Sequence, residues 1–236
     1  MESIDNGADI VVFPEMSITG YPIADLLYEN GFVNQNMIIL DEISSKSTKP
    51  LILGYVHNED GRLFNSAAIC INGKQTFRCD KVLLPTYDVF DEQRYFRPAS
   101  RSGLLTLELP EKTWNIGLTI CEDLWVEEEI QGDRLSGPDP IRDLAQEKID
   151  LLLNLSASPF THRKELIRHK IAAKAARRNN VVPGIIYGSD IESINITVQK
   201  NELAKKMSNE AFYSQILNIK LDDGTEQKVI LKDVQR

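Results

Sequence analysis

The amino-acid sequence predicts an α/β fold made of layered sheets and helices. Short apolar runs alternate with helical patterns along the chain, and two of these runs flank an Asn-Gly turn. Hairpins mixed with strand–helix–strand units are typical of α/β architectures. Hydrophobic residues make up 42% of the 236 residues. This fraction is enough for a sizeable core, and the length allows one large domain or two small ones.

The expected elements follow a regular order. Apolar runs bounded by turn residues indicate strands, which we expect at 8–13, 49–56, 63–71, 75–84, 104–109, 113–121, 150–158 and 181–188. We expect a short helix after the loop that begins at Ser17, and further helices at 139–149 and 164–180. In the last of these, Ile167, Ile171 and Ala175 share one face, and basic residues crowd the C-terminal end, where they suit the helix dipole.

Residues 188–236 have a different character and form a predicted tail of unknown role. The tail contains strand-like runs, a helical run at 201–217 and a hairpin turn at 222–226. It is able to fold, but no residue pattern in it indicates chemistry. The domain prediction is therefore one domain at residues 1–187 followed by this divergent tail.

Charge and cysteine content restrict the functional class. The formal net charge is -8, with a pI of about 5.0, which argues against a general nucleic-acid binder. No apolar window is long enough to span a membrane, and the N-terminus lacks the basic, apolar and cleavage regions of a signal peptide. An odd, small number of cysteines suggests reduced thiols. We therefore expect a cytoplasmic protein without nucleic-acid or membrane partners.

The three cysteines are Cys70, Cys79 and Cys121. A two-residue turn at residues 72–73 would pair Cys70 with Gln75 and place Cys79 opposite Ser66. That register argues against a disulfide between the first two cysteines. The cysteines and histidines show no metal-ligand spacing, so we expect no metal site.

Three ionisable residues lie at or just beyond the end of a predicted strand: Glu15, Lys81 and Cys121. Strand ends are common places for active sites, because the sheet holds side chains rigidly while the loops admit a substrate. Taken singly, each residue has a simpler explanation as a solvated loop acid, a surface lysine or a buried core thiol. The surrounding segments and their order favour the functional interpretation.

Four segments carry a resemblance to a known family: FPEMSITGYP, DKVLLPTYDVFDEQRYF, GLTICEDLW and NLSASPF. In this order they resemble the nitrilase, or carbon–nitrogen hydrolase, superfamily. Within this superfamily, the chain most resembles the glutamine-hydrolysing domain of glutamine-dependent NAD synthetase. Three stretches carry this narrower resemblance: LPTYDVFDEQRYFRPA, ICEDLW and SGPDPIRDLA. The resemblance covers about residues 7 to 187. It implies a nitrilase-type α-β-β-α sandwich.

The resemblance implies hydrolysis of the L-glutamine side-chain amide through a cysteine thioester, with the ammonia supplied for NAD synthesis. Cys121 would be the nucleophile, Glu15 the general base and acid, and Lys81 the oxyanion stabiliser. A free thiol is only a few per cent ionised at neutral pH and needs a base. A carboxylate can carry the proton, and an ammonium stabilises the developing oxyanion. No metal or organic cofactor is implied.

Further residues match positions that the family uses around these three. Glu92 would hold the lysine in place. Tyr87, Ser158 and Lys164 match positions that bind the glutamine substrate. Glu122 would meet the ammonium group of the substrate. Each has a structural alternative: a solvated acid, a packing aromatic, a turn serine, a helix-start lysine or a structural salt bridge.

The sequence departs from the family at both ends. Family members have a strand and a long helix before the segment around Glu15, so we expect an incomplete sandwich whose exposed edge favours a homo-oligomer. The family's synthetase half has an ATP-binding SGGxDS loop, and the nearest stretch here, SGPDP at 136–140, lacks the glycine pair. We therefore expect ATP to be used only by a synthetase domain absent from this chain, as in a separate NAD synthetase. Two alternatives stay open: a nitrilase-like amidase acting on another small amide, or a truncated non-catalytic structural or interaction domain.

Overall fold

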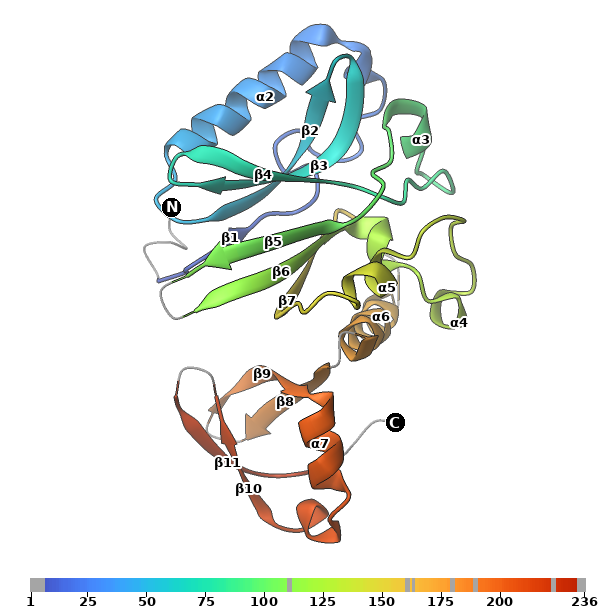
Figure 1. Ribbon diagram of the computed structural model, residues 1–236. Helices are drawn as coiled ribbons and strands as arrows, with labels where there is room; N and C mark the ends of the chain where they lie inside the picture. The colour runs from blue at the N-terminus through green and yellow to red at the C-terminus, as the bar shows by residue number, and fades with distance from the viewer. Residues whose placement is uncertain are drawn as a thin grey trace. The chain divides into compact units, whose positions relative to one another are not determined.

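The structure is a computed structural model that describes residues 7–109, 112–159, 162, 164–178, 181–188, 191–221 and 224–232. It contains two compact units, Met1–Ala175 and Ala176–Arg236, each of which is described by itself (Figure 1). The division falls inside a helix, twelve residues before the boundary that the sequence predicted after residue 187. In the described part of the chain, no helix is both long and apolar enough to cross a membrane.

The first sheet of unit 1 is built around a long antiparallel hairpin. In order across the sheet, its strands are β1 (Val11–Val12), β2 (Leu51–Glu59), β3 (Arg62–Ile71) and β4 (Lys74–Asp80). β1 runs parallel to β2, and the other neighbours are antiparallel. The predicted pairing of Cys70 with Gln75 is confirmed, but Cys79 lies opposite Ala67 instead of Ser66, because the register shifts just before Cys70. All three cysteines are free, as expected.

Helix α2 (Asn30–Ser45), preceded by the short helix η1 (Ala24–Tyr28), packs on the outer face of this sheet (Figure 1). Its apolar residues share a buried cluster with those of β2 and β3. The sequence predicted only a short helix in this region. The buried face of α2 includes Asn36 and Ser44 as well as apolar residues, which weakens the apolar period. Asn36 is satisfied by the main chain of Val56.

The second sheet has three strands: β5 (Gly103–Glu108), β6 (Thr113–Ile120) and β7 (Leu151–Leu155). β5 is antiparallel to β6, and β7 is parallel to it. Ile69 of the first sheet and Leu118 of the second belong to one buried cluster, so the two sheets pack face to face (Figure 1).

Helices cover the other face of the second sheet. They are α5 (Pro140–Leu144), shorter than its predicted range, and α6 (Lys164–Arg178). Ile141 of α5 and Ala175 of α6 lie in one cluster with Leu152 of β7. The layers of unit 1 are therefore helix, sheet, sheet and helix, which is the predicted α-β-β-α sandwich. Three short helices lie in its loops: α3 (Glu92–Tyr95), η2 (Cys121–Leu124) and α4 (Glu128–Gln131).

The second unit consists of two hairpins with helices between them. Its elements are β8 (Val181–Gly188), β9 (Ile191–Gln199), α7 (Lys200–Met207), η3 (Glu210–Tyr213), β10 (Ile216–Lys220) and β11 (Glu226–Ile230). β8 pairs with β9, although the sequence analysis grouped β8 with the first domain. The single helix predicted at 201–217 is present as the shorter α7 and η3. The turn predicted at 222–226 includes residues 222–223, which lie outside the described residues, and its flanking strands pair as a hairpin.

Candidate active site

Glu15 lies in the turn that follows β1, and its side chain is only 2% exposed. The main-chain N–H of Ala157 donates a hydrogen bond to its Oε2 at 3.0 Å. The turn passes directly against Gly54 of β2. A Cβ at residue 54 would lie 2.3 Å from the nitrogen of Met16 and 2.7 Å from the carbonyl carbon of Glu15. Only glycine therefore lets the backbone of this turn approach the sheet so closely.

Lys81 follows β4 and places a buried ammonium between two carboxylates. Its Nζ lies 2.8 Å from Oε1 of Glu15 and 2.8 Å from Oε1 of Glu92, while its side chain is 1% exposed. Asn65 Nδ2 donates to Oε1 of Glu15 at 2.8 Å, and Tyr21 Oη donates to Oε1 of Glu92 at 2.8 Å. The structure therefore brings the predicted base, the predicted cation and the predicted supporting acid into one hydrogen-bonded cluster.

The charges in this cluster fix the protonation of Lys81. Burial by itself would lower the pKa of the ammonium, but Glu15 and Glu92 outweigh burial and raise that pKa well above its ordinary value. Burial raises the pKa of the Glu92 carboxyl, against the lowering effect of Lys81. Lys81 is therefore a permanent positive charge at neutral pH.

Cys121 begins η2 immediately after β6 ends. Its φ is +46°, a left-handed value that is uncommon for a residue with a Cβ and is often found at functional turns. Burial raises the pKa of the Cys121 thiol to about 12, although Lys81 acts to lower it. At neutral pH the residue is thus a thiol, and a nearby base must take its proton before it can attack.

The end of β7 places Cys121 beside the acidic cluster. Ser156 Oγ donates to Sγ of Cys121 at 3.4 Å, and the next residue, Ala157, donates its N–H to Glu15. Two adjacent residues therefore touch the predicted nucleophile and the predicted base. This contact brings the three residues predicted from strand ends into one site.

Tyr87 and Glu122 form a pair. Tyr87 Oη donates to Oε2 of Glu122 at 2.7 Å, and burial raises the pKa of the Glu122 carboxyl. Tyr87 is 46% exposed, whereas Glu122 is buried next to Cys121 in the chain. The pair therefore reaches from the protein surface to the turn that carries Cys121, and a substrate-binding role for it stays a prediction.

Ser158 and Lys164 are held differently. The N–H of Ser158 donates to Ser156 Oγ at 3.3 Å, and its carbonyl oxygen accepts from Arg168 at 3.2 Å. Lys164 Nζ lies 5.3 Å from the ring centroid of Trp125. Burial lowers the pKa of Lys164, while the charges of the site act in the opposite direction. No hydrogen bond among the described residues joins Lys164 to the cluster of acids.

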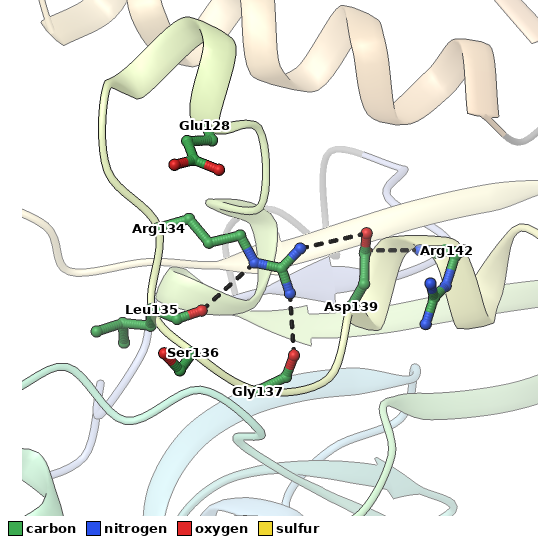
Figure 2. A pocket seen from close by; sticks show the side chains of 7 residues that line it. All are labelled: Glu128, Arg134, Leu135, Ser136, Gly137, Asp139 and Arg142. Atoms are coloured by element: carbon green, nitrogen blue, oxygen red, sulfur yellow. Dashed lines mark hydrogen bonds and ion pairs between the residues drawn. The ribbon is translucent and has the colours of Figure 1, made fainter.

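A separate polar pocket of about 480 Å³ lies between α4 and α5 and contains none of the predicted site residues (Figure 2). Its lining residues are Glu128, Arg134, Leu135, Ser136, Gly137, Asp139 and Arg142. The guanidinium of Arg134 donates to the carbonyl oxygens of Leu135 and Gly137 and lies 3.7 Å from Asp139 (Figure 2). Arg134 therefore organises its own loop.

Asn65 and Ser156 belong to the site although neither was predicted from the sequence. A polar residue in the middle of a predicted buried strand was an available signal for Asn65. Among the described residues, no group of three His, Cys, Asp or Glu side chains is arranged to hold a metal ion. The expectation that amide hydrolysis uses no cofactor stays a prediction.

Residues 1–185 match the carbon-nitrogen hydrolase family, and the chain belongs to this family. Its more specific likeness is to glutamine-dependent NAD(+) synthetases. The chain is 39% identical over 186 residues to that of Synechocystis sp., covering 74% of this chain and 32% of the relative. It is 32% identical over 167 residues to that of Thermotoga maritima, covering 70% and 27%. The chain thus spans about a third of the length of these relatives.

Solved structures agree with the predicted fold. The glutamine-dependent NAD+ synthetase from Acinetobacter baumannii, in complex with ADP, matches with a TM-score of 0.66 at 27% identity, covering 85% of this chain and 36% of that chain. An amidase from Nesterenkonia sp. AN1 matches with a TM-score of 0.58 at 15% identity, covering 74% and 65%. The second likeness shows a shared fold alone.

The C-terminal part matches a different family. Residues 160–236 match the ribosomal L25p family. Over 67 residues the chain is 48% identical to large ribosomal subunit protein bL25 of Psychrobacter sp., covering 28% of this chain and 30% of the relative. The sequence analysis assigned no family to this part. Both family matches include residues 160–185, which contain α6 and the start of β8.

Proposed function

We propose that unit 1 hydrolyses the side-chain amide of L-glutamine through a thioester on Cys121. The observation that carries the proposal is the ammonium of Lys81, held 2.8 Å from Glu15 at a site that also contains the thiol. The likeness to glutamine-dependent NAD(+) synthetases supports glutamine as the substrate. Within a carbon-nitrogen hydrolase, these groups are suited to acyl transfer from an amide to a thiol.

In the first half of the reaction, Glu15 takes the proton of the thiol, and Sγ of Cys121 attacks the amide carbon. The carbonyl oxygen gains the negative charge, which the Lys81 ammonium stabilises. When the C–N bond breaks, Glu15 gives the proton to the leaving nitrogen, and ammonia departs. The acyl group stays on sulfur as a thioester.

In the second half, Glu15 takes a proton from water, and the hydroxide attacks the thioester carbon. Lys81 again stabilises the oxyanion. The C–S bond breaks, the sulfur recovers a proton from Glu15, and glutamate leaves. Glu92 holds the Lys81 ammonium in place throughout, because it accepts a hydrogen bond from Nζ at 2.8 Å. Each step is balanced with one carboxylate as the proton carrier.

Substrate binding is assigned to the residues nearest the nucleophile turn. Glu122 meets the ammonium group of glutamine, and Tyr87 orients Glu122 through their 2.7 Å hydrogen bond. Ser158 and Lys164 complete the binding surface. The ammonia passes to an ATP-dependent NAD synthetase. We propose that the protein works in the cytoplasm as a homo-oligomer.

Ammonia release from L-glutamine by the purified chain, beside the Cys121→Ala variant, tests the proposal. Release that disappears in the variant supports it. Release from another small amide but not from glutamine favours the alternative amidase. An absence of release from every amide, with a Cys121 inert toward a glutamine-like electrophile, favours a non-catalytic role.

A second candidate function concerns unit 2. Its 48% identity to a large ribosomal subunit protein favours association of residues 176–236 with that subunit. This part carries nine Lys and Arg against eight Asp and Glu, so the acidic surplus of the chain lies in unit 1. Co-sedimentation of the chain with large ribosomal subunits tests this association, and a chain that stays at the top of the gradient at low salt contradicts it.

A further inference from the structure

One buried carboxylate joins two of the segments that form the proposed site. Asp123, in η2, is fully buried. Its Oδ1 accepts hydrogen bonds from the N–H groups of Val82 at 3.0 Å and Leu83 at 2.7 Å. Its Oδ2 accepts from the N–H of Ile120 at 3.0 Å. One side of the carboxylate therefore holds the chain just after the proposed cation, and the other holds the chain just before the proposed nucleophile.

The two ends of this connection differ in how firmly the rest of the fold holds them. The N–H of Lys81 donates to the carbonyl oxygen of Asn65 in β3 at 2.9 Å, so the lysine backbone is tied to the sheet. Cys121 has a left-handed backbone, which persists only where the surroundings enforce it. The hydrogen bond from the N–H of Ile120 to Asp123 closes the turn. Because Asp123 also binds the segment after Lys81, which is tied to β3, this bond fixes the turn relative to that sheet.

The chemistry of Asp123 suits this connection. An ionised carboxylate has about four acceptor sites and no donor, so three converging N–H groups match it. Burial raises the pKa of Asp123 to about 7, while the three N–H groups and the charge of Lys81 act to lower it. The main-chain donors therefore help to keep this buried group charged at neutral pH.

We propose that Asp123 is a positioning residue that sets the distance between the sulfur of Cys121 and the ammonium of Lys81. It acts through the main chain and touches neither group. Its kinetic consequence rests on the proposed function. Its geometric consequence can be measured without glutamine hydrolysis, because burial at this position raises the pKa of the thiol and limits its reaction with an added reagent.

The Asp123→Asn variant breaks one side of the connection. Asparagine keeps an acceptor oxygen for the N–H groups of Val82 and Leu83. Its NH₂ group then faces the N–H of Ile120, and two donors cannot bond each other. The turn that carries Cys121 thereby loses one of its bonds, although Ile120 stays paired with Leu155 and the carbonyl oxygen of Cys121 still accepts from Asn154. The lysine segment keeps its bonds to residue 123.

Asp139→Asn is the matched control. Asp139 is also a buried acid that accepts a main-chain hydrogen bond, from the N–H of Arg142 at 2.9 Å, and it caps α5 outside the proposed triad. Both variants exchange a carboxylate for an amide. Both tryptophans of the chain lie in unit 1, so melting followed by tryptophan fluorescence shows whether each variant keeps this unit folded.

The first readout is the rate at which iodoacetamide alkylates Cys121 at pH 8.5, followed by mass spectrometry of the peptide. Burial is the largest cause of the raised thiol pKa, and a sulfur that leaves its position is less buried, so folded Asp123→Asn should react at least about threefold faster than the wild type and Asp139→Asn. The second readout is glutamine hydrolysis. We expect kcat to fall about 100-fold in Asp123→Asn, because moving a reacting group by about 1 Å slows the reaction by about this factor. KM should change less than about threefold.

Alkylation of folded Asp123→Asn at or below the wild-type rate would overturn the proposal, whatever the hydrolytic activity. If the wild type releases no ammonia from glutamine, the proposed function fails, and the alkylation rates still decide the role of Asp123. Asp123→Ala loses both sides of the connection and should speed alkylation at least as much as Asp123→Asn. A smaller effect of the alanine variant would also count against the connection described here.

Discussion

Replacing Lys81 by methionine tests whether the buried ammonium holds the two acids of the site together. Methionine keeps most of the volume of the side chain but removes its charge. Glu15 and Glu92, each bonded to Nζ at 2.8 Å, would then be left as buried acids without a cation. The variant therefore isolates the electrostatic contribution of Lys81 to the fold of unit 1.

The expected effect is large because the side chains of all three groups are at most 4% exposed. Breaking a buried ion pair by removing one partner lowers the free energy of unfolding by about 3–5 kcal/mol. For a domain of this size, that loss corresponds to a decrease in Tm of about 6–20 °C. A surface pair gives the contrast. Lys46 and Glu42 are more than half exposed, so Lys46→Met should cost less than about 1 kcal/mol.

The effect should also depend on pH. Burial raises the folded-state pKa of Glu92. A carboxyl of this kind contributes stability that is fully present below its unfolded pKa, and this stability is lost as the pH rises through the folded pKa. Lys81 lowers the pKa of Glu92, so its removal raises that pKa further and moves the loss to higher pH. We therefore expect a larger loss of stability in Lys81→Met at pH 8 than at pH 5.

Urea unfolding followed by tryptophan fluorescence is the assay, since Trp114 and Trp125 both lie in unit 1 and report on this unit alone. Lys46→Met is measured beside Lys81→Met at both pH values. A loss below about 1 kcal/mol at pH 8, or a larger loss at pH 5 than at pH 8, would refute the reasoning.

Three further predictions concern the nucleophile, a glycine and a substrate contact. The alkylation rate of Cys121, measured by peptide mass spectrometry, should rise about tenfold per pH unit from pH 7.5 to 10, because the pKa of its thiol is about 12. A rate that reaches a plateau below pH 9 would contradict this prediction. Gly54→Ala should lower the free energy of unfolding by about 3 kcal/mol in urea, whereas Gly31→Ala, where a Cβ meets open space, should change it by less than about 1 kcal/mol. Tyr87→Phe removes the hydrogen bond to Glu122 and should raise KM for glutamine more than it lowers kcat in steady-state kinetics. An unchanged KM would remove Tyr87 from the binding surface.

The fold was predictable wherever one apolar period dominates a segment. The strands of both sheets of unit 1 carry such runs, and each overlaps its predicted range, although β1 is confined to Val11–Val12 and β4 already ends at Asp80. Helix α2, predicted only as a short helix, buries Asn36 and Ser44, and the side chain of Asn36 is satisfied by the main chain of Val56 in another element. The one-residue error at Cys79 has a similar cause, because an irregularity in the pairing of β3 and β4 leaves no mark in the pattern of apolar residues.

The grouping of the candidate site was predictable where an ionisable residue lies at a strand end, as with Glu15, Lys81 and Cys121. Their assembly depends on contacts between distant segments. Ser156 reaches the thiol from 35 residues away, and Ala157 reaches Glu15 from 142 residues away. Such contacts depend on how the two sheets face each other, which the local pattern of either sheet does not determine.

The hydrogen bonds from Ala157 to Glu15, and from Val82, Leu83 and Ile120 to Asp123, all come from main-chain N–H groups. A main-chain donor is the same whatever side chain the residue carries, except proline, which has none. These four positions therefore keep their bonds to the acids under any side chain that their surroundings can pack, and three of them, Val82, Leu83 and Ile120, are buried. Among apolar substitutions of similar size at these three positions, proline should be the one that each position rejects.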